Sequence, residues 1–108
     1  MYLPVRHGEG KIVPMDQNLL NELEKKQLIA MQYVSPETDT PTQEYPYNPN
    51  GSPLGAAGLT DPSGRIFGLM PHPEAFNHPT NHPGWTRGET APLGALIFEN
   101  GVKYLSGQ

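Results

Sequence analysis

Apolar residues recur at helical intervals in one stretch near the start of the chain. Leu19, Leu20 and Leu23 have the i, i+3, i+4 spacing that places side chains on one helix face. Asp16 precedes them and is a residue type that caps helices, while lysines follow where cations suit a helix C-terminus. The pattern predicts a helix that begins after Asp16, with Leu28 as a further candidate for its buried face.

Short runs of strand-forming residues surround this helix. They lie at 2–6, 11–13, 29–34, 55–60 and 65–70. The last two runs are joined by Asp61-Pro62-Ser63-Gly64, in which proline and glycine occupy positions that favour a type I turn. We therefore expect a hairpin whose second strand leads into residues 71–74.

Proline interrupts most of the remaining chain. Five prolines between residues 35 and 53 prevent both periodicities and predict a long loop. A second proline-broken stretch, 75–89, carries the only tryptophan. Ala91-Pro92 is suited to open a closing helix. Its predicted buried side comprises Leu93, Leu96, Ile97 and Tyr104.

Composition favours a loop-rich piece of no more than one domain. The chain has 108 residues, of which 12 are glycine and 13 are proline. Its net charge of −4 and its lack of a basic cluster give no electrostatic footprint for nucleic acid or anionic lipid. No apolar run is long enough to span a bilayer, and the first residues lack the regions of a signal peptide. We expect a cytoplasmic protein without nucleic-acid or membrane partners.

The segment Pro71-His72-Pro73-Glu74 is the strongest candidate for chemistry. The prolines predict a stiff, extended ribbon, in which side chains two residues apart point to the same side. Glu74 could then accept the Nδ1 proton of His72 and leave Nε2 as a general base. For an isolated His-x-Glu pair, a surface loop is the commoner interpretation. The chain contains no cysteine, so a cysteine nucleophile would have to lie outside it.

Two other segments are candidates for a substrate or interface loop. His7 and Glu9 form a second His-x-Glu pair, flanked by glycines, for which a polar turn is the alternative. Asn48, Asn50 and Ser52 belong to a segment that could present backbone donors to a ligand, or form a plain turn.

A metal site is a further alternative. His72, Glu74, His78 and His82 are acceptable zinc ligands. However, Pro79 interrupts the helix that would place His78 and His82 on one face. We therefore expect no metal.

Several motifs agree in order and spacing with one known family. They lie at 3–10, 32–34, 48–52, 57–60 and 64–74 and include His-Gly-Glu-Gly, Asn-Pro-Asn-Gly-Ser and Met-Pro-His-Pro-Glu. Together they resemble class I glutamine amidotransferases, in particular the C-terminal half of the glutaminase subunit of phosphoribosylformylglycinamidine synthase. Segment 75–89 is longer and richer in histidine and proline than the family pattern.

The resemblance implies an α/β fold with a flavodoxin-like open sheet and a Cys-His-Glu triad. Residues 1–108 would be the C-terminal part of that domain, with short strands, a hairpin and two helices. His72 would be the general base and Glu74 would orient it. The implied reaction is hydrolysis of the side-chain amide of L-glutamine through a γ-glutamyl thioester. The ammonia would pass to a synthetase subunit in purine biosynthesis, and no cofactor is implied.

The resemblance also implies a missing partner. The cysteine and its oxyanion hole would belong to an N-terminal half, so we expect this chain to be inactive alone. Because that half would cover one face and one edge of the sheet, we also expect self-association. The alternative is a non-catalytic interaction module that docks on a synthetase subunit.

Overall fold

The chain has a small α/β fold and divides into two compact units. A computed structural model describes residues 1–6, 8 and 10–107. One unit combines Met1–Arg6 with Pro71–Gln108, and the other spans His7–Met70. The described part contains two α-helices and two antiparallel sheets.

Helix α1 (Gln17–Lys25) begins where its sequence predicts. Asp16 is the N-cap, and its side chain accepts a hydrogen bond from the Leu19 N–H at 2.8 Å. Leu20 is buried, whereas Leu28 lies beyond the helix end, where its N–H donates to the Leu23 carbonyl. The start of the helix is confirmed, and the inclusion of Leu28 on its face is wrong because the helix ends before it.

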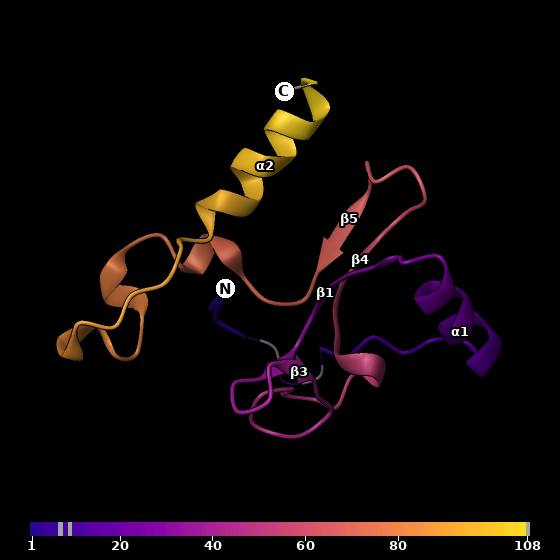
Figure 1. The fold of residues 1–108 in the computed structure, drawn as a ribbon, viewed down its shortest axis with the longest axis horizontal. Helices are drawn as coiled ribbons and strands as arrows, with labels where there is room; N and C mark the ends of the chain where they lie inside the picture. Colours follow the sequence, from indigo (N-terminus) through magenta and orange to yellow (C-terminus); the bar gives the residue numbers. More distant parts are fainter. Residues whose placement is uncertain (7, 9, 108) are drawn as a thin grey trace. The chain divides into compact units, whose positions relative to one another are not determined.

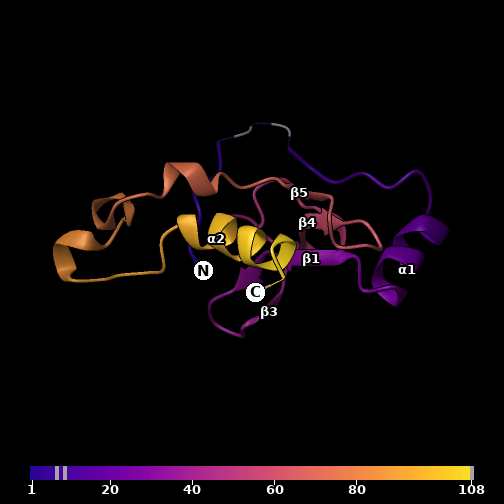
Figure 2. The same cartoon turned by 90° about the horizontal axis from the view of Figure 1, so that it is seen from above.

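The main sheet contains β1 (Ile29–Gln32), β4 (Ala56–Thr60) and β5 (Phe67–Leu69) in the order β1-β4-β5. Both pairings are antiparallel, and the strands lie side by side in both views (Figures 1 and 2). The Gly64 N–H donates to the Asp61 carbonyl at 3.0 Å and closes the turn between β4 and β5. The predicted hairpin is confirmed, because its turn chemistry is local to these four residues.

The predicted long loop is wrong at its start. β2 (Val34–Ser35) and β3 (Thr40–Pro41) pair antiparallel as a second small sheet. Pro41 pairs with Val34 although it has no N–H to donate, because an edge position does not require one.

The other unit contains three single-turn 3-10 helices and the closing helix. These are η2 (Pro73–Ala75), η3 (Pro79–Asn81), η4 (Trp85–Arg87) and α2 (Ala95–Leu105). Helix α2 begins at Ala95, four residues after the predicted start, and none of its residues is buried. The predicted buried side is therefore wrong. Its packing neighbour in this unit is η2, a single turn that is too short to cover a helix of this length.

Two predicted strands do not form. Segments 2–6 and 11–13 belong to no strand among the residues the structure describes. Single hydrogen bonds hold them instead: the His72 N–H donates to the Pro4 carbonyl at 2.9 Å, and the Ile12 N–H donates to Ser52 Oγ at 3.0 Å. A strand requires a ladder of backbone bonds, which isolated bonds do not provide.

Among the described residues, no helix combines the length and the apolar character needed to cross a membrane.

Candidate active site

The side chains of His72 and Glu74 contact each other directly. Nδ1 of His72 lies 2.5 Å from Oε1 of Glu74, and the two side chains are 40% and 59% exposed. The hydrogen bond from His72 is the largest cause that lowers the pKa of Glu74 below its usual value. Glu74 is therefore an ionised acceptor at neutral pH.

The backbone that brings the two side chains together differs from the predicted ribbon. Residues Pro73–Ala75 form the 3-10 turn η2, with His72 as its N-cap. The Ala75 N–H donates to the His72 carbonyl at 3.1 Å, and the Phe76 N–H donates to the Pro73 carbonyl at 3.1 Å. Proline suits the first position of a helical turn, where an N–H would have no partner. The predicted contact is present, but a tighter turn produces it.

Two neighbouring segments hold this turn. The His72 N–H donates to the Pro4 carbonyl at 2.9 Å, and the Gly94 N–H donates to the Phe76 carbonyl at 2.8 Å. A Cβ on Gly94 would overlap the carbonyl oxygen of Pro73. Phe76 has no exposed surface. The turn is therefore fixed at both ends by close backbone packing.

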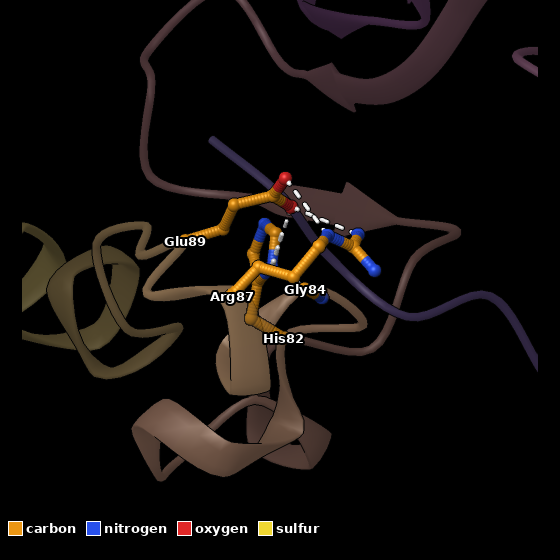
Figure 3. A network of polar contacts seen from close by, with 4 residues as sticks. All are labelled: His82, Gly84, Arg87 and Glu89. Atoms are coloured by element: carbon orange, nitrogen blue, oxygen red, sulfur yellow. Dashed lines mark hydrogen bonds and ion pairs between the residues drawn. The ribbon is translucent and has the colours of Figure 1, made fainter.

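Another histidine of the same unit lies inside it. The side chain of His82 is only 13% exposed, and its Nδ1 accepts the Gly84 N–H at 3.0 Å (Figure 3). Oε2 of Glu89 lies 3.8 Å from that nitrogen and 3.4 Å from Nη2 of Arg87. Sequence reasoning considered His82 only as a zinc ligand.

The zinc interpretation finds no support in this geometry. Within the described ranges, no three His, Cys, Asp or Glu side chains gather closely enough to hold a metal ion. His78 instead caps η3 through Thr80. The proline-broken backbone thus gives each histidine a different partner.

Two polar residues of the 48–52 segment face inward. Asn48 and Ser52 are each 1% exposed. The Nδ2 group of Asn48 donates to the carbonyls of Thr42 and Ser52 at 2.8 and 3.1 Å, and Oδ1 of Asn48 accepts the Ser52 N–H at 3.0 Å. That this segment presents backbone donors to a ligand stays a prediction, and the N–H of Ser52 is already used in the bond to Asn48.

The same segment also anchors the residues that follow the first His-x-Glu pair. Asn50 Nδ2 donates to the Gly10 carbonyl at 2.9 Å, and Ser52 Oγ accepts the Ile12 N–H at 3.0 Å. His7 and Glu9 themselves lie outside the described residues, so their predicted role stays a prediction.

The arrangement at η2 has the parts of a general base. The carboxylate of Glu74 is hydrogen-bonded to Nδ1 of His72, and Nε2 of His72 makes no hydrogen bond to any described residue. An imidazole held this way can accept a proton at Nε2, and the carboxylate stabilises the resulting cation. The sequence contains no cysteine, so a thiol that this base could deprotonate is not among its own residues.

The chain is similar in sequence to known phosphoribosylformylglycinamidine synthases and their PurQ subunits. The chain is 39% identical over 106 residues to the phosphoribosylformylglycinamidine synthase subunit PurQ of Dehalococcoides mccartyi, with 96% of this chain and 39% of that subunit covered. It is 35% identical over 118 residues to a subunit PurQ of Methanococcus maripaludis, with 98% and 43% covered. It is 50% identical over 70 residues to the phosphoribosylformylglycinamidine synthase of Drosophila melanogaster, with 65% and 5% covered.

These matches confirm the resemblance to the glutaminase subunit of phosphoribosylformylglycinamidine synthase. The chain spans 39% to 43% of the length of the two PurQ subunits just described. Residues 1–105 match the CobB/CobQ-like glutamine amidotransferase domain. The chain therefore belongs to the family of CobB/CobQ-like glutamine amidotransferase domains.

Proposed function

We propose that this chain carries the general base and the orienting carboxylate of a glutaminase that serves phosphoribosylformylglycinamidine synthesis. The observation that carries the proposal is the contact between His72 Nδ1 and Glu74 Oε1 at 2.5 Å. The family match and the PurQ relatives support the proposal, because they make glutamine chemistry the expected chemistry of the chain. In the proposed site, Glu74 orients His72, and Nε2 of His72 faces the reacting thiol.

The proposed reaction proceeds through a covalent intermediate. Nε2 of His72 takes the thiol proton of a cysteine, and the thiolate attacks the side-chain amide carbon of glutamine. The imidazolium returns that proton to the leaving amine, so ammonia departs and a γ-glutamyl thioester remains. Water, deprotonated by His72, then attacks the thioester, and the imidazolium returns the proton to the departing cysteine thiolate, which releases glutamate. The ionised Glu74 stabilises each imidazolium, which agrees with its lowered pKa.

The cysteine of the proposed site comes from a polypeptide segment outside this sequence. Loss of a nucleophile from a triad costs on the order of 10⁶-fold in kcat, so the chain alone should not release ammonia from glutamine. We also propose that the outside segment contributes strands that complete a flavodoxin-like open sheet. β1 and β5, as the edge strands of the described sheet, are the places where added strands could pair.

The complete assembly would act in the cytoplasm beside a synthetase subunit that receives the ammonia. Without the missing segment, the exposed apolar residues Ile66 and Phe67 next to the β5 edge favour self-association.

A chimera tests the catalytic proposal. This chain replaces the matching segment of the Dehalococcoides mccartyi PurQ subunit, and ammonia release from glutamine is measured. We expect activity in the parent chimera, a loss on the order of 10⁶-fold in kcat for His72→Ala and on the order of 10⁴-fold for Glu74→Gln. His78→Ala is the matched control, because His78 is an exposed histidine of the same unit whose ring contacts the Thr80 hydroxyl.

Two results would contradict the proposal. A folded chimera that lacks activity would exclude the catalytic role, and so would parent-like activity of His72→Ala. Ammonia release by the isolated 108-residue chain would contradict the outside origin of the nucleophile.

One observation favours the alternative of a non-catalytic interaction module. Helix α2 exposes Phe98, Val102 and Leu105, which recur at i, i+4 and i+7 on one stripe. If the folded chimera binds the synthetase subunit with parent-like affinity but is inactive, the interaction module is the better description.

A further inference from the structure

We propose that His82 is a positioning residue for the His72–Glu74 pair. Its ring, packed with the rings of Tyr2 and Phe76, holds the η2 turn in the conformation that joins the pair. The effect on catalysis rests on the proposed function, whereas the effect on the turn does not.

Three rings from separate parts of the chain form one cluster. The ring centroids of Tyr2 and His82 are 4.8 Å apart, those of Phe76 and His82 are 6.4 Å apart, and those of Tyr2 and Phe76 are 6.5 Å apart. These separations lie in the range where tilted and edge-to-face ring pairs attract. Each ring therefore contacts both of the others, and His82 contributes two of the three contacts.

The cluster reaches both ends of the η2 turn. Phe76 is the C-cap residue of η2, and its ring is fully buried. Tyr2 lies two residues before Pro4, whose carbonyl accepts the His72 N–H. Packing of the Tyr2 ring on His82 therefore fixes the segment that holds the first residue of the turn, and packing of Phe76 fixes the last.

His82 is held as a packing group instead of a second base. Its Nδ1 accepts the Gly84 N–H at 3.0 Å, which in the neutral ring leaves the proton on Nε2 (Figure 3). Oε2 of Glu89 lies near the same nitrogen and is paired with Arg87. Both the burial and the occupied nitrogen suit a fixed ring.

Segment 75–89, to which the sequence pattern assigned no role, carries two of the three rings of the cluster. His82 lies between the 3-10 turns η3 and η4 of this segment. We infer that the added residues act as a brace for the turn that bears the pair.

Nuclear magnetic resonance of the 108-residue chain tests the brace directly. The readout is the imidazole signals of His72 and the titration of Glu74, with the His78 signals of the same sample as an internal reference. His82→Phe keeps a ring but loses the Nδ1 acceptor, whereas His82→Asn keeps an acceptor but loses the ring. We expect His82→Phe to preserve the His72 signals. We expect His82→Asn to move them towards those of Glu74→Gln.

Other outcomes overturn the inference. If His82→Asn leaves the His72 signals and the Glu74 titration at parent values, the ring does not position the pair. If His82→Phe disturbs them as much as His82→Asn does, the Nδ1 acceptor matters and the ring does not. Should His82→Asn fail to fold, Tyr2→Ala removes a ring from the terminal segment and must move the His72 signals for the inference to stand.

The catalytic consequence is measured in the chimera. Displacement of a catalytic group by about 1 Å costs about 100-fold in rate, so His82→Asn should lower kcat by about that factor with little change in KM. His82→Phe, which keeps a ring at this position, should restore kcat and serves as the matched control. An inactive chimera with the expected His72 signals would refute the proposed function and keep the brace. An active His82→Asn chimera with unchanged signals would refute the brace and keep the proposed function.

Discussion

Substitution of glycine by alanine should have opposite effects on stability at Gly94 and at Gly101. Gly94 has right-handed helical angles, so an alanine there is not strained by its backbone. The obstacle is steric: an added Cβ would overlap the Pro73 carbonyl oxygen and lie 2.6 Å from its carbon. Gly101 is inside α2, and a Cβ there meets nothing within 4 Å.

The magnitudes follow from these contacts. The segments must separate by at least about 0.8 Å, because the Pro73 carbon needs that shift to reach an ordinary contact of 3.4 Å and the nearer oxygen needs more. That shift would break the 2.8 Å hydrogen bond from the Gly94 N–H to the Phe76 carbonyl. Overpacking costs about 1–3 kcal/mol and the lost bond about 1 kcal/mol, so Gly94→Ala should destabilise the protein by about 2–4 kcal/mol. Gly101→Ala should stabilise it by about 0.5–1 kcal/mol through helix propensity.

Thermal unfolding followed by circular dichroism measures both effects. With about 4 °C per kcal/mol for a chain of this size, Gly94→Ala should lower Tm by about 8–16 °C and Gly101→Ala should raise it by about 2–4 °C. A Gly94→Ala variant that melts within about 2 °C of the parent would refute the close packing of Gly94 on η2.

Three further predictions concern the unit His7–Met70. The pKa of Asp61 is lowered from 3.8 to about 2, chiefly by its hydrogen bond with the Ser63 side chain. A carboxyl whose pKa is lowered by folding stabilises the fold at pH values above its ordinary pKa, and this stabilisation is lost as pH falls. The parent should therefore lose stability as pH falls from 3.8 towards 2, and Asp61→Ala should lose less. Thermal unfolding of both proteins across that pH range measures the difference. Asn48→Ala should destabilise the protein by about 1–3 kcal/mol because it orphans buried backbone groups, whereas the exposed Asn100→Ala should stay within about 0.5 kcal/mol in urea titrations. The hydroxyl of Tyr33 is buried and has no hydrogen-bond partner among the described residues, and burial raises the pKa of Tyr33. Tyr33→Phe should therefore raise the free energy of unfolding by about 1 kcal/mol. A decrease in that free energy would show that the hydroxyl does have a hydrogen-bond partner.

The contact between His72 and Glu74 could be predicted from their spacing, but its backbone could not. A proline restricts its own φ and disfavours helical angles in the residue before it, which argued for an extended ribbon. The structure places Pro73 at the first position of a 3-10 turn, where its fixed φ is equally suitable. Neighbouring segments decide between these options, through the Pro4 carbonyl and through Gly94.

Local chemistry alone determined the elements that the sequence predicted correctly. Asp16 caps α1, and Asp61 with Gly64 closes the hairpin, because each of these features depends on residues within a few positions. Only the tertiary structure decided that Asn48 turns inward and that the ring of His82 packs with those of Tyr2 and Phe76. These positions depend on packing between residues that are far apart in the chain. The spacing of apolar and polar residues along the sequence does not reveal such contacts.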